Sequence, residues 1–304
     1  MAGEHHPSQA HPSDKTLWAG AILILVFAAI EAIAGWWAGS LALLGDAGHM
    51  LTDATALTLA ALAVWVGRQP PSTRHSFGLV RAEVVAALIN GLFMLVVVAS
   101  IVFHAIGRLL SPQPVGAMTV MVVATIGLIV NIIVALILHR GVSNLNTRAA
   151  LLHVMGDLLG SVAALLAGIV IYFTGWLPID PLLSLVICAL ILYSSLHLLR
   201  DVFHVIMEGV PPYLDLAEVG SAISGVAGIV SVHDLHIWTL ASGHVALSAH
   251  MVLQDMGQWQ GVLDSVRSML SDRYGIDHVT LQPVATDNAG NTVLCESIGT
   301  EKSV

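Results

Sequence analysis

Charged side chains are scarce in this sequence. Asp, Glu, Lys and Arg make up 10% of the 304 residues, hydrophobic residues make up 56%, and the mean hydropathy is +0.84. This composition excludes an ordinary soluble globular domain and indicates that lipid surrounds much of the chain. Only 11 basic residues stand against 20 acidic ones, and the net charge of -9 gives no indication of a nucleic-acid partner.

Cysteines are also rare, and a cleavable signal peptide and a zinc-hydrolase motif are missing. The two cysteines, Cys188 and Cys295, show no sign of pairing, and they carry no information about the redox compartment. The N-terminal run MAGEHHPSQAHPSDK has no basic-then-apolar start, so we expect no cleavable signal peptide. The sequence HExxH does not occur, which weighs against a zinc-dependent hydrolase.

Six apolar windows are long enough to cross a bilayer as helices, which takes about 20 residues for about 30 Å of hydrocarbon. Lys and Arg gather in the loops on one side, with Arg108 as the exception, so both termini are predicted to be cytoplasmic. Without an organelle-type extension, we expect a multi-pass protein of the cell (cytoplasmic) membrane. The predicted spans are 17–39, 41–66, 83–110, 116–139, 149–174 and 181–199.

After Pro211 and Pro212 the composition changes to that of a small soluble domain. Its apolar spacing predicts the order αββαβ, with a hairpin at Ser242 and Gly243. The predicted elements are helices at 215–227 and 258–274 and strands at 230–240, 245–253 and 276–284. The predicted divisions are a His-bearing cytoplasmic tail (1–16), a membrane domain (17–210), a cytoplasmic α+β domain (211–284) and a mobile tail (285–304).

Two predicted spans carry the same pair of side chains. The run GDAGHMLTDAT in the second span places Asp46, His49 and Asp53 within about 60° of one helix face. The run LLHVMGDLLGS in the fifth span places His153 and Asp157 four residues apart. At about 1.5 Å per residue, Asp53 and Asp157 both lie about 18 Å from the outer side of the membrane. The two pairs are therefore predicted to converge.

Two imidazoles and two carboxylates form a tetrahedral donor set that suits zinc. The plainer interpretation is that each HxxxD pair is a local hydrogen bond within its helix, but two pairs at equal depth favour a metal site. The four ligands carry two negative charges, which a divalent cation cancels. An empty site should take up protons, so metal and protons compete, and alternating access then predicts antiport.

The motifs SLALLGDAGHMLTD, RHSFGLVRAEVVAALING, LLHVMGD and VHDLHIW resemble those of the cation diffusion facilitator family, over roughly residues 16–284. The resemblance implies a six-helix membrane domain, a ferredoxin-like cytoplasmic domain, a homodimer, and zinc export in exchange for protons. It also implies that the transport site consists of His49, Asp53, His153 and Asp157. Histidine at position 49 is similar to the zinc-preferring pattern of the family.

The resemblance points to further metal ligands in the cytoplasmic domain. His233, His236 and His250 resemble metal-binding positions of the family. Strand alternation predicts that His233 and His236 face opposite ways, so His233 with His250 is the better pair. The family's further ligand is expected at 281–284, where LQPV offers none. Asp277 and His278 just upstream could substitute, or could be ordinary surface residues.

Other polar residues have two interpretations each. Asp46, Glu31 and Asn131 could line an access path, although Glu31 and Asn131 could equally bond between helices. A charge interlock between domains, or a plain interfacial ion pair, could be formed by Arg74, Arg81 and Glu83. The N-terminal histidines could capture metal or belong to an ordinary tail; they are His5, His6 and His11.

Two other functions fit parts of this pattern. A polytopic zinc enzyme would need an open metal position and a general base, whereas a closed site would use all four candidate ligands. A membrane-bound metal sensor would keep signalling after loss of a mid-membrane ligand. We expect no cofactor: zinc is the transported substrate and a candidate regulatory ion, and cadmium, cobalt or nickel are alternative cargo because their ligand preferences are similar.

Overall fold

The computed structural model describes residues 14–140, 145–241 and 243–285, with side chains described for all of these except 14–24, 57, 134, 137–140 and 145–155. The described residues divide into two compact units. One takes in the chain up to Ala61 and Ile89–Leu198, and the other takes in Leu62–Leu88 and the described residues from Leu199 onward.

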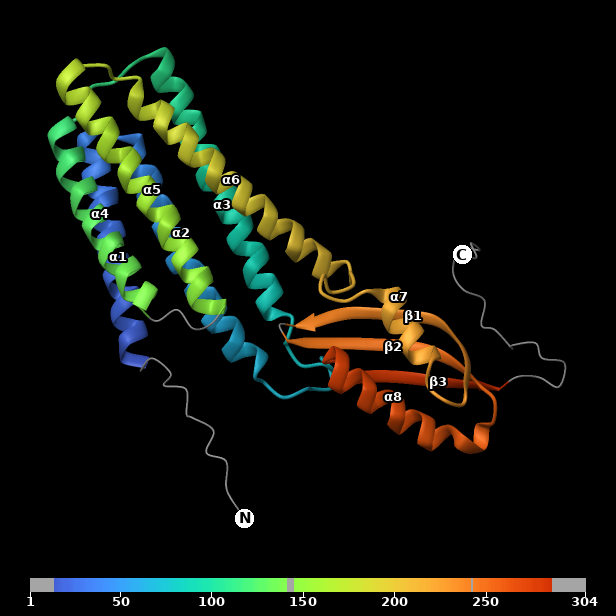
Figure 1. Ribbon diagram of the computed structural model, residues 1–304. Helices are drawn as coiled ribbons and strands as arrows, with labels where there is room; N and C mark the ends of the chain where they lie inside the picture. Colours follow the sequence, from blue (N-terminus) through green and yellow to red (C-terminus); the bar gives the residue numbers. More distant parts are fainter. Residues whose placement is uncertain (1–13, 141–144, 242, 286–304) are drawn as a thin grey trace. The chain divides into compact units, whose positions relative to one another are not determined.

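Long helices build the first part of the chain, and each coincides with one predicted span (Figure 1). They are α1 (Asp14–Ala38), α2 (Leu41–Gly67), α3 (Ala82–Leu110), α4 (Ala117–Arg140), α5 (Leu145–Thr174) and α6 (Ile179–Ile206). Over the described residues, α2, α3, α6 and the Gly156–Thr174 part of α5 are long and apolar enough to cross a membrane. The described apolar parts of α1 and α4 are shorter, Leu25–Ala38 and Ala117–Ile133, so six full spans remain a prediction.

The helices of the first unit pack around two larger apolar cores, and a smaller cluster of Phe27, Ala28 and Met50 joins α1 to α2. One core joins α1, α2, α4 and α5 through small and medium side chains such as Ala38, Leu43 and Ala164. The second core joins α3 and α6 through Ile101 and Ile191 with their neighbours. Because the outer surfaces of these helices are also apolar, many large hydrophobic side chains stay exposed, as expected for helices surrounded by lipid.

Glycines allow α2 to approach its neighbours closely. A Cβ at Gly160 of α5 would lie 2.7 Å from the Oδ1 atom of Asp46, and one at Gly48 would lie 3.1 Å from Val97 of α3. Real Cβ atoms do not tolerate the first distance without displacement of a neighbour. Helix α2 is therefore in close contact with α5 at Gly160 and with α3 at Gly48, as is common at small residues of membrane helices. At Gly156 the described residues leave open space instead.

The second unit holds a three-stranded sheet in the order β1-β2-β3, with β1 and β2 antiparallel and β2 and β3 parallel (Figure 1). Its elements follow the predicted order: α7 (Leu216–Ser224), β1 (Ile229–Ala241), β2 (His244–Leu253), the short 3-10 helix η1 (Met256–Gln258), α8 (Trp259–Tyr274) and β3 (His278–Ala285). Val262, Val266 and Leu270 recur every four residues on α8 and are buried with α7 against one face of the sheet. The predicted α+β module is confirmed.

Candidate metal centre

Helices α2 and α5 bring three predicted ligands together. Nε2 of His49 lies 3.5 Å from Oδ2 of Asp53 and 3.4 Å from Oδ1 of Asp157. One ligand atom from each of the three residues lies within 4.8 Å of the others, and no second group of this kind occurs among the described residues. The side chains are 19%, 20% and 14% exposed, so the cluster is largely withdrawn from the surface.

The contact between His49 and Asp53 alone would fit the local interpretation, because the two residues lie four apart on one helix. The contact between His49 and Asp157 does not, because Asp157 belongs to another helix. The cluster therefore depends on how α2 packs on α5. His153, the fourth predicted ligand, lies on α5 one turn before Asp157, but its side chain falls outside the described residues.

A chain of buried polar groups adjoins this cluster. Nδ2 of Asn131 on α4 donates to the hydroxyl of Ser161 on α5 at 3.2 Å, and that hydroxyl donates to Oδ2 of Asp46 at 3.5 Å. Asn131 is 7% exposed and Asp46 is 2% exposed. Asn131 thus bonds between helices, one of the two roles expected for it. Ser161 was not predicted, although its spacing of four residues from Asp157 places it on the same face of α5.

Glu31 on α1 is fully buried, and neither of its carboxylate oxygens has a hydrogen-bond partner among the described residues. A Cβ at Gly127 of α4 would lie 3.1 Å from Oε1 of Glu31, so this carboxyl group sits against α4. A buried carboxyl group without such a partner is costly in apolar surroundings. Glu31 was expected either to line an access path or to bond between helices. Among the described residues it makes no hydrogen bond to another helix.

A cavity of about 420 Å³ opens beside the cluster. Asp46 and His49 line it from α2, and Ser194 lines it from α6. The rest of its wall is formed by α5 and α6 and is mostly apolar, including Leu159, Leu166, Leu183, Ile187 and Leu190. An ion in this cavity would therefore meet few polar partners other than the ligands themselves.

In the second unit, His233 and His250 lie directly opposite each other in the β1–β2 register, as the predicted pair requires. Our expectation that His233 and His236 face opposite ways was wrong. The register shifts between them, so that His236 pairs with Ser248, two residues from His250. A bulge at Asp234, whose φ of 53° is left-handed, therefore returns both histidines to one face of the sheet.

The remaining candidates in this unit have ordinary partners. Nε2 of His233 bonds to the Ser231 hydroxyl at 2.9 Å, and Nε2 of His236 lies 3.0 Å from Oδ1 of Asp234. Asp277 accepts a hydrogen bond from Ser271 at 2.7 Å, and the ring of His278 stacks edge-on against Phe77. Gln282 of the LQPV run pairs with His250 across β2 and β3.

Arg81 pairs with Glu208 and not with Glu83. Nη2 of Arg81 lies 3.1 Å from Oε1 of Glu208, and the two side chains are 46% and 61% exposed. An ion pair this exposed is worth about 0–1 kcal/mol. Among the described residues Arg74 and Glu83 form no ion pair, and His5, His6 and His11 lie outside those residues.

These features define a class: a polytopic helical membrane protein with a candidate divalent-metal centre between two helices and a small α+β domain. Two family models match the chain, one for the cation efflux transmembrane domain over residues 17–207 and one for the cytoplasmic domain of cation efflux proteins over residues 211–283. The chain therefore belongs to the cation efflux family, the cation diffusion facilitators, whose members are transporters and not enzymes.

Relatives match along almost the whole chain. A "Cadmium, cobalt and zinc/H(+)-K(+) antiporter" of Bacillus velezensis is 40% identical over 302 residues, which cover 97% of this chain and 96% of that protein. The zinc transporter ZitB of Escherichia coli is 40% identical over 290 residues, covering 93% and 92%. The zinc transporter ttm-1 of Caenorhabditis elegans is 36% identical over 290 residues, covering 89% and 71%.

Proposed function

We propose that this chain exports zinc from the cytoplasm in exchange for protons, with His49, Asp53, His153 and Asp157 as the transport site. The observation that carries this proposal is the imidazole of His49, which lies within 3.5 Å of carboxylates on α2 and α5. Cadmium, cobalt and nickel are further candidate cargo, and the names of the bacterial relatives include cadmium, cobalt and zinc.

The donor chemistry favours zinc. Imidazole and carboxylate together suit a tetrahedral divalent ion, and His153 would complete the set of four. The ligand atoms of His49, Asp53 and Asp157 already lie within 4.8 Å of one another, so only small side-chain movements are needed to enclose an ion. Two carboxylates and two neutral imidazoles balance a divalent charge, which lets the loaded site remain in surroundings of low polarity.

Proton exchange follows from the same atoms. Ligands must lose their protons before they hold zinc, so protons and metal compete for the site. When zinc leaves, two carboxylates remain close together in the helix bundle, and proton uptake relieves their repulsion. If the site opens to one side at a time, each cycle moves zinc one way and protons the other.

The cavity beside the cluster supports an access path. Asp46 lies at its wall one turn before His49. Asp46, Ser161 and Asn131 are hydrogen-bonded in series, and Glu31 lies in the same bundle without a described hydrogen-bond partner. These groups would pass an ion or its protons between the site and one end of the bundle.

We further propose a homodimer in the cell membrane with both termini cytoplasmic. The distribution of Lys and Arg supports the orientation, and the family of the second domain supports the homodimer.

Zinc flux into liposomes tests the proposal. The full-length protein would be reconstituted around a trapped zinc-sensitive dye, and zinc entry would be followed with and without a proton gradient. We expect gradient-dependent entry for the wild type and no loss in Asp264→Asn. For Asp157→Asn we expect at least a tenfold loss, because even changes to residues that only orient metal ligands commonly cost about 10- to 100-fold. Asp264 is an exposed carboxylate on α8 and serves as the matched control. Flux that is insensitive to the gradient, or unchanged by Asp157→Asn, would contradict the proposal.

A further inference from the structure

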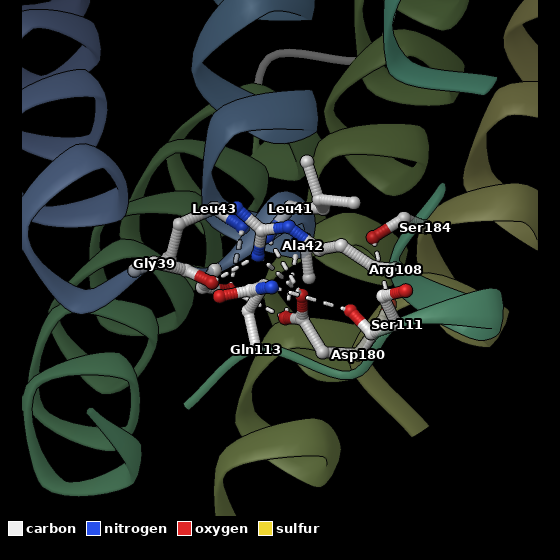
Figure 2. A network of polar contacts seen from close by, with 10 residues as sticks. Gly39, Leu41, Ala42, Leu43, Arg108, Ser111, Gln113, Asp180 and Ser184 are labelled. Carbon is white, nitrogen blue, oxygen red and sulfur yellow. Dashed lines mark hydrogen bonds and ion pairs between the residues drawn. The ribbon is translucent and has the colours of Figure 1, made fainter. Parts of the chain in front are cut away.

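A buried carboxylate at the start of α6 binds the beginning of another helix. Asp180 is fully buried, and its carboxylate accepts hydrogen bonds from the Ser40 hydroxyl at 2.5 Å, the Leu41 amide at 2.7 Å and the Ala42 amide at 3.3 Å (Figure 2). The first amides of a helix have no partner within that helix. Ser40, the residue just before α2, caps the helix in the usual way by accepting from the Leu43 amide at 3.3 Å, and Asp180 adds a second cap from a residue 139 positions away from Leu41.

Arg108 at the end of α3 completes this arrangement. Its Nη1 atom lies 3.8 Å from Oδ2 of Asp180 and donates to the carbonyl oxygen of Gly39 (Figure 2). Gly39 follows the last residue of α1 and has a φ of +64°, the left-handed conformation that commonly ends a helix. The ends of α1 and α3 and the starts of α2 and α6 thus meet at one ion pair. We call Arg108, Asp180 and their partners Gly39, Ser40, Leu41 and Ala42 the latch.

The latch joins the two larger apolar cores of the first unit. Helices α1 and α2 belong to one core, whereas α3 and α6 form the other. Where α2 meets α3, α2 presents glycines, which have no side chains: Gly45 faces Ile101 and Gly48 faces Val97. Apolar contacts of this kind are not directional, so they leave the depth and rotation of a helix weakly defined. Hydrogen bonds are directional, and those of the latch define both quantities.

The metal ligands of α2 begin a short distance from the latch. His49 and Asp53, the proposed ligands on α2, follow Leu41 by eight and 12 residues, or about 12 and 18 Å along the helix axis. A helix turns by about 100° per residue, so a shift of α2 by even part of a residue would carry His49 away from Asp157. Metal ligands and their supports must hold position to within about 0.5 Å.

We propose that Asp180 and Arg108 are positioning residues for transport: they hold the first turns of α2 so that His49 and Asp53 meet Asp157 of α5. This inference rests on the proposed function, because it takes those three residues as the transport site. It also accounts for Arg108, the exception in the distribution of basic residues: its charge is matched by Asp180, and its guanidinium bonds to the end of α1.

Asp180→Asn tests the inference in the full-length protein. The asparagine keeps one oxygen acceptor but loses the charge that binds Arg108 and strengthens the bonds to the α2 amides. We expect faster hydrogen exchange at the amides of residues 41–47, and a zinc affinity that is weaker by about tenfold, as for other residues that orient metal ligands. Affinity would be measured in detergent by competition with a fluorescent zinc chelator. Gln113→Ala is the control, because Gln113 is exposed beside the latch and bonds only weakly, to Ser111.

A charge swap separates capping from simple ion pairing. In the double variant Arg108→Asp with Asp180→Arg the ion pair is restored, but a guanidinium cannot accept hydrogen bonds from the amides of α2. We expect zinc affinity to stay low in this variant. Recovery to the wild-type value would contradict the capping role. If Asp180→Asn does not fold, Asp180→Glu keeps the carboxylate and is judged by the same two measurements.

Two results would overturn the inference. Unchanged exchange at residues 41–47 would mean that Asp180 does not hold the start of α2. Faster exchange with unchanged zinc affinity would mean that the latch only stabilises the fold. A wild type that binds no zinc would instead refute the proposed function, and the exchange rates would still decide whether the latch holds α2.

Discussion

The imidazole of His49 has two carboxylate neighbours of different origin. Asp53 lies one turn away on the same helix, so its contact follows from helix geometry alone. Asp157 comes from α5, and its distance of 3.4 Å depends on the packing of two helices. A change in packing should therefore disturb the second contact more than the first, and residues that allow the close approach matter as much as the ligands.

Gly160→Ala tests this dependence. The added Cβ would lie 2.7 Å from Oδ1 of Asp46, so Asp46 or the whole of α5 must move. Overpacking of this kind costs about 1–3 kcal/mol, and we expect a lower midpoint of thermal unfolding in detergent. Gly107→Ala is the control, because a Cβ there meets no described atom within 4 Å. Equal midpoints for the two variants would show that the helices are not in close contact at Gly160.

At the scale of single elements, local sequence signals predicted the helices and strands well. The apolar windows are long and end at polar or glycine residues, so α1–α5 begin and end within four residues of the predicted limits, whereas α6 continues to Ile206, seven residues beyond its predicted end. The αββαβ order also followed from local spacing, because the buried face of α8 repeats every four residues. Local signals failed at Asp234, where the bulge depends on one residue in the left-handed region, which Asp tolerates more readily than most residues but does not require.

The start of α7 offers a quantitative test of one such local signal. The side chain of Asp215 accepts hydrogen bonds from the amides of Ala217 at 2.8 Å and Glu218 at 3.0 Å. Loss of such a cap in Asp215→Ala costs about 1 kcal/mol. We expect the α7 amides to exchange about fivefold faster, because each 1 kcal/mol changes an opening equilibrium by about this factor. Asp264→Ala, on an exposed face of α8, should leave α7 unchanged; equal exchange in both variants would rule out the cap.

At the scale of the whole molecule, the contacts that could not be predicted join residues far apart in the sequence. The HxxxD spacing on two spans pointed to the proposed ligands, because each pair is local and only their convergence had to be inferred. Asp180 and Arg108 gave no such signal, since an Asp near a helix start and an Arg near a helix end are common. Their pairing becomes visible only when α3 and α6 lie together against the turn between α1 and α2. The pairing of Arg81 with Glu208, 127 residues away, is of the same kind.

In the proposed transport cycle, zinc binding and proton release are one event at the centre between α2 and α5. In that cycle protons and zinc compete for the same ligand atoms, so we expect zinc affinity to fall as the pH is lowered. The family relationship alone does not say which atoms exchange the protons. The exchange at these atoms is therefore the claim to be tested.

Counting the protons released as zinc binds tests this claim most directly. Calorimetric titrations of the detergent-solubilised protein in buffers of different ionisation heat give that number for the wild type, Asp157→Asn and the control Asp264→Asn. If zinc displaces protons from these ligand atoms, the wild type and the control release protons equally, and Asp157→Asn releases fewer and binds zinc more weakly. Tight zinc binding without proton release, or release that Asp157→Asn leaves unchanged, would contradict it.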